Sequence, residues 1–240
     1  MGREIETQFT FGQKVDVGAS GNPVWSRDAK RIAFNLYTPG NPSRLSAKAS
    51  DGAGEIETLL VDGEIPWDWS KDGRELIYGN MQVLQLGDSG ISRSAAIPSI
   101  SDQQASNAPL SPDNRWIAYT SSASGQPEVF VQPYTSPGSV TRAGGKIQLS
   151  RNGGERPRWR GDGKELFYVS MDGLMAAPIE ASGEGMRATA PTKLFDLDPN
   201  DFLLWDLSRD GQRFLVAKRI TGGANPPIIV VENWRAALKK

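Results

Sequence analysis

The stretch Leu110-Ser-Pro-Asp-Asn-Arg-Trp-Ile-Ala-Tyr119 decides the fold, because a version of it occurs five times along the chain. Each version contains an aspartate, then a small or turn-forming residue, and then a strand-like run of apolar and aromatic residues. The aspartates are 41 to 49 residues apart and stand at Asp28, Asp72, Asp113, Asp162 and Asp210. A chain of 240 residues with such a period is built from one structural unit used repeatedly.

The local chemistry of the repeat predicts β-structure. Asp followed by Gly, Asn or Ala is typical of a hairpin turn, since the carboxylate bonds nearby N–H groups and the next residue accepts a positive φ. A short segment with Trp or Leu precedes each turn, and strand-like segments such as 128–132 and 146–150 complete the copy. Four strands in roughly 40–50 residues is the size of a propeller blade. The predicted fold class is therefore an all-β propeller of five four-stranded blades.

The strand count suggests how the ring closes. The fifth copy supplies three strand-like segments, and an unassigned one at residues 6–11 precedes the first copy. We expect segment 6–11 to pair into the last blade, which removes two open sheet edges. The alternative is an open fragment of a six- or seven-bladed propeller. The expected organisation is one domain, 1–240, with blades at 22–61, 66–97, 107–150, 156–196 and 203–234, and a tail at 235–240.

Composition excludes several classes of function. The chain has 27 Lys and Arg against 28 Asp and Glu with no long run of one sign, which disfavours binding to nucleic acid. It contains neither Cys nor His, so a Ser-His-Asp triad, a thiolate nucleophile and the usual zinc sites are excluded. The longest apolar runs are too short to span a bilayer. We expect no cofactor, no metal, no catalytic residue and no membrane insertion by this sequence.

Repeated residues have a structural interpretation first. The five aspartates are expected to stabilise turns rather than to bind a metal, since they are about one blade apart. Trp25, Trp69 and Trp159 occupy one repeat position, where a large aromatic fills the gap between neighbouring sheets.

A candidate binding site follows from positions that break the repeat. If side chains alternate along the innermost strands, the residues two and four before the motif Ser line the central channel. Carboxylates and guanidiniums gather there, and two extra tryptophans lie one residue away. The charged groups could simply form ion pairs, such as Asp68 with Arg158. The functional alternative is a polar channel mouth for a small polyol, a peptide terminus or a cation. The predicted ligand-binding residues are Asn22, Trp67, Asp68, Asn107, Arg156, Arg158, Trp205 and Asp206.

Two further classes of function remain open. Asp68 and Asp206 could act as the acid and base of a glycoside hydrolase. Alternatively, the long polar loops at 37–46, 99–107, 137–146 and 220–227 could form a protein-interaction platform. We favour a non-catalytic binding module, with an unknown protein or small polar ligand as its partner, and a monomeric chain.

The repeat resembles the TolB-like, WD-type propeller repeat at residues 23–28 and 110–119. Segments 128–134, 157–168 and 229–234 are similar to the C-terminal propeller of bacterial receptor-type serine/threonine protein kinases. This resemblance implies a sensor or interaction domain placed after a kinase domain and a membrane helix, and therefore an extracytoplasmic location. The chain itself has no Gly-rich loop before a strand Lys and no His-Arg-Asp catalytic loop, and the resemblance implies no catalytic residues.

Overall fold

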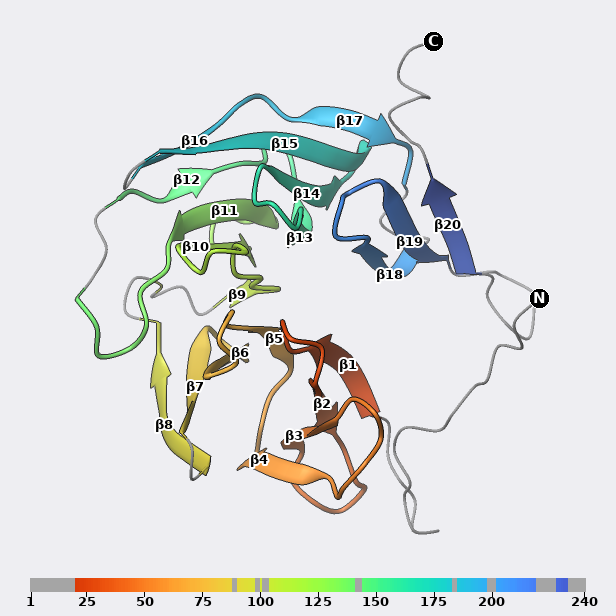
Figure 1. The fold of residues 1–240 in the computed structure, drawn as a ribbon. Coiled ribbons are helices and arrows are strands. Elements are labelled where there is room, and N and C mark those ends of the chain that lie inside the picture. The colour runs from red at the N-terminus through yellow and green to blue at the C-terminus, as the bar shows by residue number, and fades with distance from the viewer. Residues whose placement is uncertain are drawn as a thin grey trace. The chain divides into compact units, whose positions relative to one another are not determined.

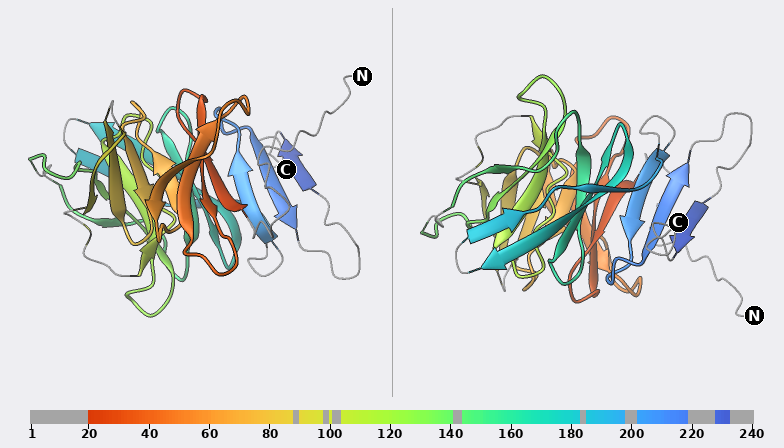
Figure 2. Two further views of the ribbon diagram at one scale, coloured as in Figure 1. Left: turned by 90° about the horizontal axis from the view of Figure 1, so that it is seen from below. Right: turned by 90° about the horizontal axis from the view of Figure 1, so that it is seen from above.

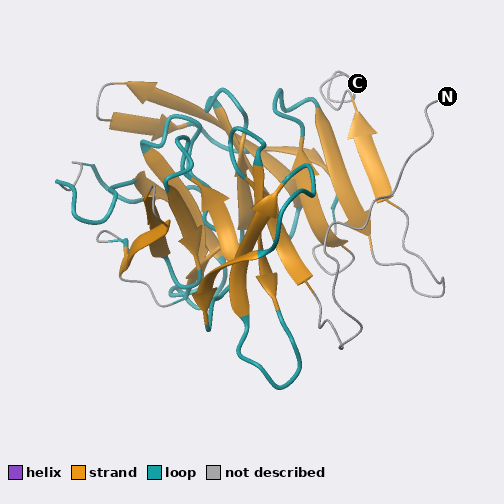
Figure 3. Cartoon of the chain, turned by 60° about the horizontal axis from the view of Figure 1, so that its bottom comes forward, coloured by secondary structure: helices purple, strands orange, loops and turns teal. Residues whose placement is uncertain are grey.

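Tight turns between short antiparallel strands organise the whole described chain. The computed structural model describes residues 20–87, 90–97, 100, 104–140, 144–182, 185–197, 202–218 and 228–232. These residues form strands, turns and loops but no helix (Figure 3). The expected strand at 6–11, the loop at 220–227 and the tail at 235–240 lie outside the described residues.

The described residues form two units, which divide within β8 between Ser94 and Ala95. In the first unit two four-stranded sheets follow the chain order, β1-β2-β3-β4 and β5-β6-β7-β8 (Figure 1). Their strands are β1 (Ser20–Trp25), β2 (Arg31–Leu36), β3 (Arg44–Ala49), β4 (Glu57–Val61), β5 (Pro66–Trp69), β6 (Glu75–Tyr78), β7 (Gln82–Gly87) and β8 (Gly90–Ala96).

The second unit contains three sheets. One holds β9 to β12, one holds β13 to β17, and one holds β18 to β20. Their strands are β9 (Ala105–Ser106), β10 (Trp116–Ser121), β11 (Glu128–Pro133), β12 (Ile147–Gln148), β13 (Glu155–Trp159), β14 (Glu165–Ser170), β15 (Gly173–Ser182), β16 (Gly185–Ala188), β17 (Thr192–Phe195), β18 (Phe202–Leu207), β19 (Arg213–Lys218) and β20 (Ile228–Glu232).

Successive sheets in each unit pack face to face through apolar side chains. In the first unit Ala33 and Leu45 of one sheet share a buried cluster with Trp69 and Leu76 of the next. In the second unit two such clusters fill the spaces on either side of the β13–β17 sheet. Figure 2 shows the twist of the individual sheets. Four-stranded meanders stacked in chain order are propeller blades, so the predicted all-β propeller architecture is confirmed at this level.

The fourth blade differs from the prediction of four strands. Its third strand, β15, is 10 residues long and pairs with β17 along its first half and with β16 along its second. The outer strand is thus divided in two, and the sheet has five strands. The sequence around Gly185 carries no strong strand signal, which explains why β16 was not predicted.

Candidate functional site

The five repeat aspartates all make the same turn. In every copy Oδ1 accepts a hydrogen bond of 3.0 to 3.2 Å from the backbone N–H two residues later. The residue after each aspartate has a positive φ of 58° to 73°; these residues are Ala29, Gly73, Asn114, Gly163 and Gly211. Among the described residues no three acidic side chains gather to hold a metal ion. The aspartates therefore act in turns that position the strands.

A serine two residues before the aspartate completes four of these turns. In the first blade Ser26 Oγ donates to Asp28 at 2.7 Å and accepts the N–H of Arg31 at 2.9 Å. The same pair of bonds forms around Ser70, Ser111 and Ser208. The hydroxyl donation lowers the pKa of Asp28 below its ordinary value, and those of Asp72 and Asp210 likewise.

The fourth blade replaces this serine by Arg160. Its guanidinium donates to both oxygens of Asp162, at 2.7 and 2.8 Å, and also pairs with Glu165. The hydrogen bonds from Arg160 lower the pKa of Asp162 to about 2. A bidentate charged pair thus replaces the hydroxyl as donor to the aspartate, whereas the guanidinium has no acceptor for the backbone N–H that the serines bind.

The repeat tryptophans join neighbouring blades. Trp69 is fully buried, and its indole Nε1–H donates to the carbonyl oxygen of Val24 at 3.1 Å. Trp159 is 8% exposed and donates to the carbonyl of Pro109 at 3.2 Å. The packing predicted for these two is confirmed. Trp25 differs, because 54% of its surface is exposed. It lies on the first sheet of the first unit, so no described sheet of that unit precedes it in the chain.

A β-bulge interrupts the innermost strand of four blades. The register shifts between Gly21 and Val24, Pro66 and Asp68, Glu155 and Arg158, and Phe202 and Leu204. In the third blade only a short β9 and an isolated bridge at Leu110 remain. An extra residue in a bulge breaks the strict alternation of side chains. In the first, second and fourth blades the bulge falls at positions two to four before the motif residue, so the assumed alternation fails there. In the fifth blade the register is regular from Leu204 to Leu207, and the alternation holds.

Three of the predicted binding residues have left-handed backbones: Asn22 and Arg156 lie at bulges, and Asn107 stands at the equivalent position of the third blade. Asn22 has φ 51°, Asn107 has φ 49° and Arg156 has φ 53°. Asparagine tolerates this conformation because its short amide bonds locally, whereas arginine does not. The Arg156 N–H donates to Thr120 Oγ1 at 3.0 Å, and its Nε lies 3.9 Å from Glu155.

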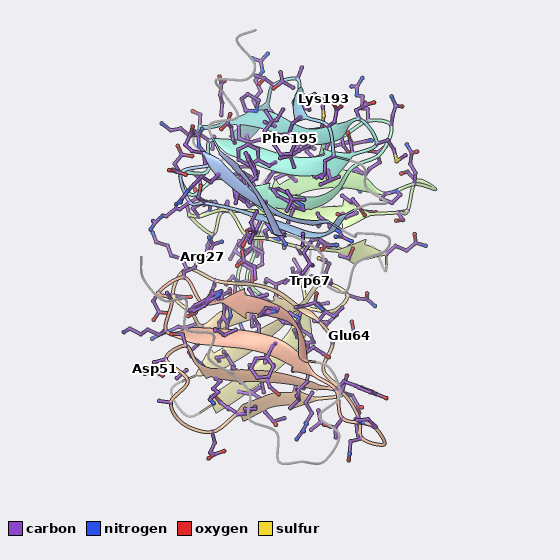
Figure 4. The ribbon with its side chains drawn as sticks, turned by 90° about the vertical axis from the view of Figure 1, so that its right-hand side faces the viewer. Arg27, Asp51, Glu64, Trp67, Lys193 and Phe195 are labelled. Carbon is purple, nitrogen blue, oxygen red and sulfur yellow. The ribbon has the colours of Figure 1, made fainter. Side chains whose placement is uncertain are left out.

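In the first unit the predicted residues Trp67 and Asp68 lie on β5. Asp68 Oδ2 accepts a 2.8 Å bond from Arg27 of the preceding blade, and its Oδ1 accepts the N–H of Trp69. Within its own unit, Asp68 thus forms an ion pair with Arg27. Trp67 is half-buried and its Nε1–H donates to Gly79 O at 2.7 Å. Arg27 and Trp67 are both labelled on this unit in Figure 4.

In the second unit the structure brings Arg158 and Trp205 together. The guanidinium carbon of Arg158 lies 6.0 Å from the centre of the Trp205 ring, within the range of a cation–π contact. Trp205 is only 4% exposed and packs with Phe167 and Phe214. The exposed Asp206 accepts the N–H of Leu207 at 2.9 Å.

Two residues of this region were missed from the sequence. Arg27 was not among the predicted site residues, yet it bonds across to the next blade. Arg160, which stands where the other copies have a serine, was not predicted to form any contact, yet it binds two carboxylates. The signal for Arg160 was available, since Glu165 and Asp162 follow it within one hairpin. Nothing in the sequence marks the pairing of Arg27, because its partner is 41 residues away.

No protein-family model matches the sequence, and no curated protein matches it. Solved structures do resemble the chain. TolB from Acinetobacter baumannii matches with a TM-score of 0.60 at 19% identity, over 90% of this chain and 52% of that chain. The Cps50 (Swd1) β-propeller domain from Myceliophteria thermophila matches with a TM-score of 0.55 at 14% identity, over 91% of this chain and 73% of that chain.

An enzyme also shares the architecture. A puromycin-hydrolysing peptidase from Mycobacterium tuberculosis matches with a TM-score of 0.53 at 15% identity, over 89% of this chain and 36% of that chain. The chain spans about half the length of the TolB chain that it matches. At these identities the likeness shows the fold alone. The fold is a β-propeller of the kind found in TolB, which confirms the TolB-like resemblance seen in the repeat.

Proposed function

We propose that the chain is a non-catalytic binding propeller, which recognises a protein partner or a small polar ligand through the first strand of its fourth blade. One observation carries the proposal: Arg156 has a left-handed backbone, with φ 53°. Such a conformation costs a non-glycine residue about 1–2 kcal/mol, and strained residues of this kind concentrate at functional sites. Asparagine occupies two equivalent positions, so the fold does not require arginine there.

The charge of β13 indicates what would bind. Arg156 and Arg158 stand two residues apart on this strand, and a third of the Arg156 side chain is exposed. Guanidinium groups bind carboxylates and phosphates through paired hydrogen bonds. We therefore expect an anionic group on the ligand or partner. Nucleic acid is not the expected ligand, since the overall charge is balanced.

Hydrolysis of glycans is the competing hypothesis, with Asp68 and Asp206 as the two carboxylates. The contacts give this reaction little support. Asp68 is held by Arg27 and by a backbone N–H, and Asp206 accepts a bond within its own strand. Both carboxylates thus already accept hydrogen bonds within the protein, and Asp206 is nevertheless exposed.

An array of acidic, neutral and basic peptides tests the binding proposal. The full chain is compared with a double variant, Arg156→Gln and Arg158→Gln, which keeps side-chain length and removes the charge. The matched control changes the exposed Arg151 and Arg187 to Gln. We expect acidic peptides to be retained by the native chain and by the control, and lost by the double variant. Equal retention by all three would refute the proposed site, and turnover of aryl-glycosides would favour the hydrolase.

The setting that we propose for this module is the sensor part of a bacterial receptor kinase. The basis is the resemblance of segments 128–134, 157–168 and 229–234 to the propellers of that family. In this setting the propeller is extracytoplasmic. No helix in the described part of the chain is long and apolar enough to cross a membrane. The reading frame of the natural gene tests this directly, because it should encode a kinase domain followed by a membrane helix.

We also propose that the ring has five blades and is closed by residues 6–11 pairing with β20, which leaves the chain monomeric. The last sheet contains three described strands, whereas each of the others has four or five. Removal of residues 1–19 should lower the melting temperature and cause association, and a peptide of residues 5–12 should reverse both. An unchanged melting temperature would contradict closure.

A further inference from the structure

A buried carboxylate holds the connection between β12 and β13 in place. Glu128 of β11 is 3% exposed, and its Oε1 accepts the backbone N–H of Gly153 at 3.0 Å. Its Oε2 accepts the hydroxyl of Ser150, which is fully buried. The N–H of Gly154 donates to the carbonyl of Pro127 at 2.8 Å. The connection is thus bound to the start of β11 by both side-chain and main-chain hydrogen bonds.

The connection contains a reactive pair of residues. Asn152–Gly153 is the one Asn–Gly sequence in the chain. Asn152 is exposed, and its side-chain amide forms no hydrogen bond with the described residues. In such a pair the backbone nitrogen of the glycine can attack the carbonyl carbon of the asparagine side chain, because glycine has no side chain that obstructs the approach. The pair is therefore a candidate for deamidation.

The products follow from the balance of this reaction. The nitrogen of Gly153 forms a bond to Cγ of Asn152 and gives up its proton, while the bond from Cγ to Nδ2 breaks and ammonia leaves with that proton. The resulting succinimide takes up one water molecule and opens to aspartate or to isoaspartate. No oxidant or reductant takes part, and water is the only co-reactant.

Glu128 opposes the first step in two ways. The N–H of Gly153 must leave its acceptor before the nitrogen can attack, and hydrogen bonds to a charged acceptor are among the stronger ones. The nitrogen also acquires negative charge as it loses its proton, and a buried carboxylate 3.0 Å away disfavours that charge. The other side chains that donate to this carboxylate are neutral, Ser150 and Gln126, so they do not cancel its charge.

We infer that Asn152–Gly153 is a deamidation site that the Glu128 carboxylate holds in an unreactive state. Formation of isoaspartate also releases the connection, because it adds one carbon to the main chain between residues 152 and 153. Gly153 and Gly154 then cannot both keep their bonds to Glu128 and Pro127. This inference goes beyond the proposed binding function and does not depend on it.

Three samples separate the effect of the fold from the reactivity of the sequence. They are the folded chain, the chain unfolded in guanidinium chloride, and a peptide of residues 147–160 with blocked ends, all kept at neutral pH. Mass spectrometry follows the tryptic fragment 152–158. We expect the peptide and the unfolded chain to react at similar rates, and the folded chain to react at least roughly tenfold more slowly. Equal rates in the folded chain and the peptide would refute the inference.

Two variants test whether Glu128 is the cause. Glu128→Gln keeps the size of the side chain and removes its charge, and should speed deamidation of the folded chain roughly tenfold. Glu180→Gln removes an exposed charge from β15 and should leave the rate unchanged. If Glu128→Gln reacts no faster than the native chain, the carboxylate does not protect the pair and the inference fails.

Hydrogen exchange in the native chain gives a test that needs no variant, in case Glu128→Gln does not fold. The amide of Gly153 should be protected from exchange by its bond to Glu128, and this protection should disappear in the purified isoaspartate form. Exchange of the Gly153 amide at the rate of the free peptide in the native chain would overturn the inference.

Discussion

The indole Nε1–H of Trp69 donates a hydrogen bond of 3.1 Å to the backbone carbonyl of Val24 on the neighbouring blade. Trp159 makes the same bond to Pro109, and both acceptors stand two residues before the turn motif of their blade. The contact therefore recurs with the repeat. It explains why a tryptophan suits this position, since the ring fills the gap between sheets and its N–H satisfies a carbonyl that faces the gap.

This bond should contribute measurably to stability. Trp69→Phe removes the N–H and part of the ring. Trp116→Phe makes the same change of side chain, but the buried Nε1 of Trp116 has no acceptor among the described residues. Both tryptophans are buried. We expect Trp69→Phe to cost about 1 kcal/mol more free energy of unfolding than Trp116→Phe, the net value of one hydrogen bond. Urea denaturation measures both, and equal costs would mean that the bond adds nothing beyond packing.

The Arg160–Asp162 pair should make stability depend on pH. The hydrogen bonds from Arg160 lower the pKa of Asp162 to about 2 in the folded chain, and an unfolded aspartate titrates near 3.9. The stabilisation is therefore complete above about pH 4 and is lost as the pH falls through about 2. Asp162→Asn should flatten the stability curve in that window, by a modest amount because the carboxylate is partly exposed.

Urea denaturation midpoints, measured from about pH 2 to about pH 5, test this effect because that range covers the titration of Asp162. Arg160→Ser serves as the control, because it restores the serine found in the other four blades. It should leave a smaller pH dependence of the same sign, since a serine also lowers the pKa of Asp28 and Asp72. If native chain and Asp162→Asn give parallel curves, the ion pair does not contribute.

Features with a local cause could be predicted from the sequence. The turns around Asp72 and Asp162 depend on a carboxylate, a backbone N–H two residues later and a residue that tolerates positive φ, all within a few positions. Strand position follows from the same turns. Five sheets at the predicted intervals are the result.

The candidate site could not be predicted in the same way. The pairing of Asp68 with Arg27 could not be foreseen, because pairing across blades depends on how two sheets pack. Trp205, predicted as a ligand-binding residue, is buried beside Phe214. The bulges near Asn22 and Arg156 change which way the flanking residues point, and only the first has a sequence signal, the asparagine itself.

The backbone contact between the fourth and fifth blades should require glycine at 161. Gly161 N–H donates to the carbonyl of Arg209 at 2.8 Å, and an added Cβ would lie 2.6 Å from that oxygen. Gly161→Ala must therefore push the two turns apart, and we expect a loss of about 1–3 kcal/mol of unfolding free energy. The control is Gly145→Ala, where a Cβ meets nothing within 4 Å and the change should stay within about 0.5 kcal/mol. Similar effects at both positions would show that the turns accommodate the methyl group.

The strain at Arg156 predicts opposite effects on stability and binding. Arg156→Asn places at φ 53° the residue type that occupies the equivalent positions at Asn22 and Asn107. We expect the unfolding free energy to stay the same or to rise by up to about 1 kcal/mol, because asparagine adopts this backbone more readily. Retention of acidic peptides should fall at the same time.

The reverse change in the third blade completes the comparison. Asn107→Arg places an arginine at φ 49° in the third blade, where it lacks the neighbour Arg158 that Arg156 has on β13. It should lower the unfolding free energy by up to about 1 kcal/mol. Thermal and urea denaturation of both variants measure the two effects. If Arg156→Asn loses more than about 1 kcal/mol, the contacts of the arginine outweigh its backbone strain, and the residue is kept for stability rather than for binding.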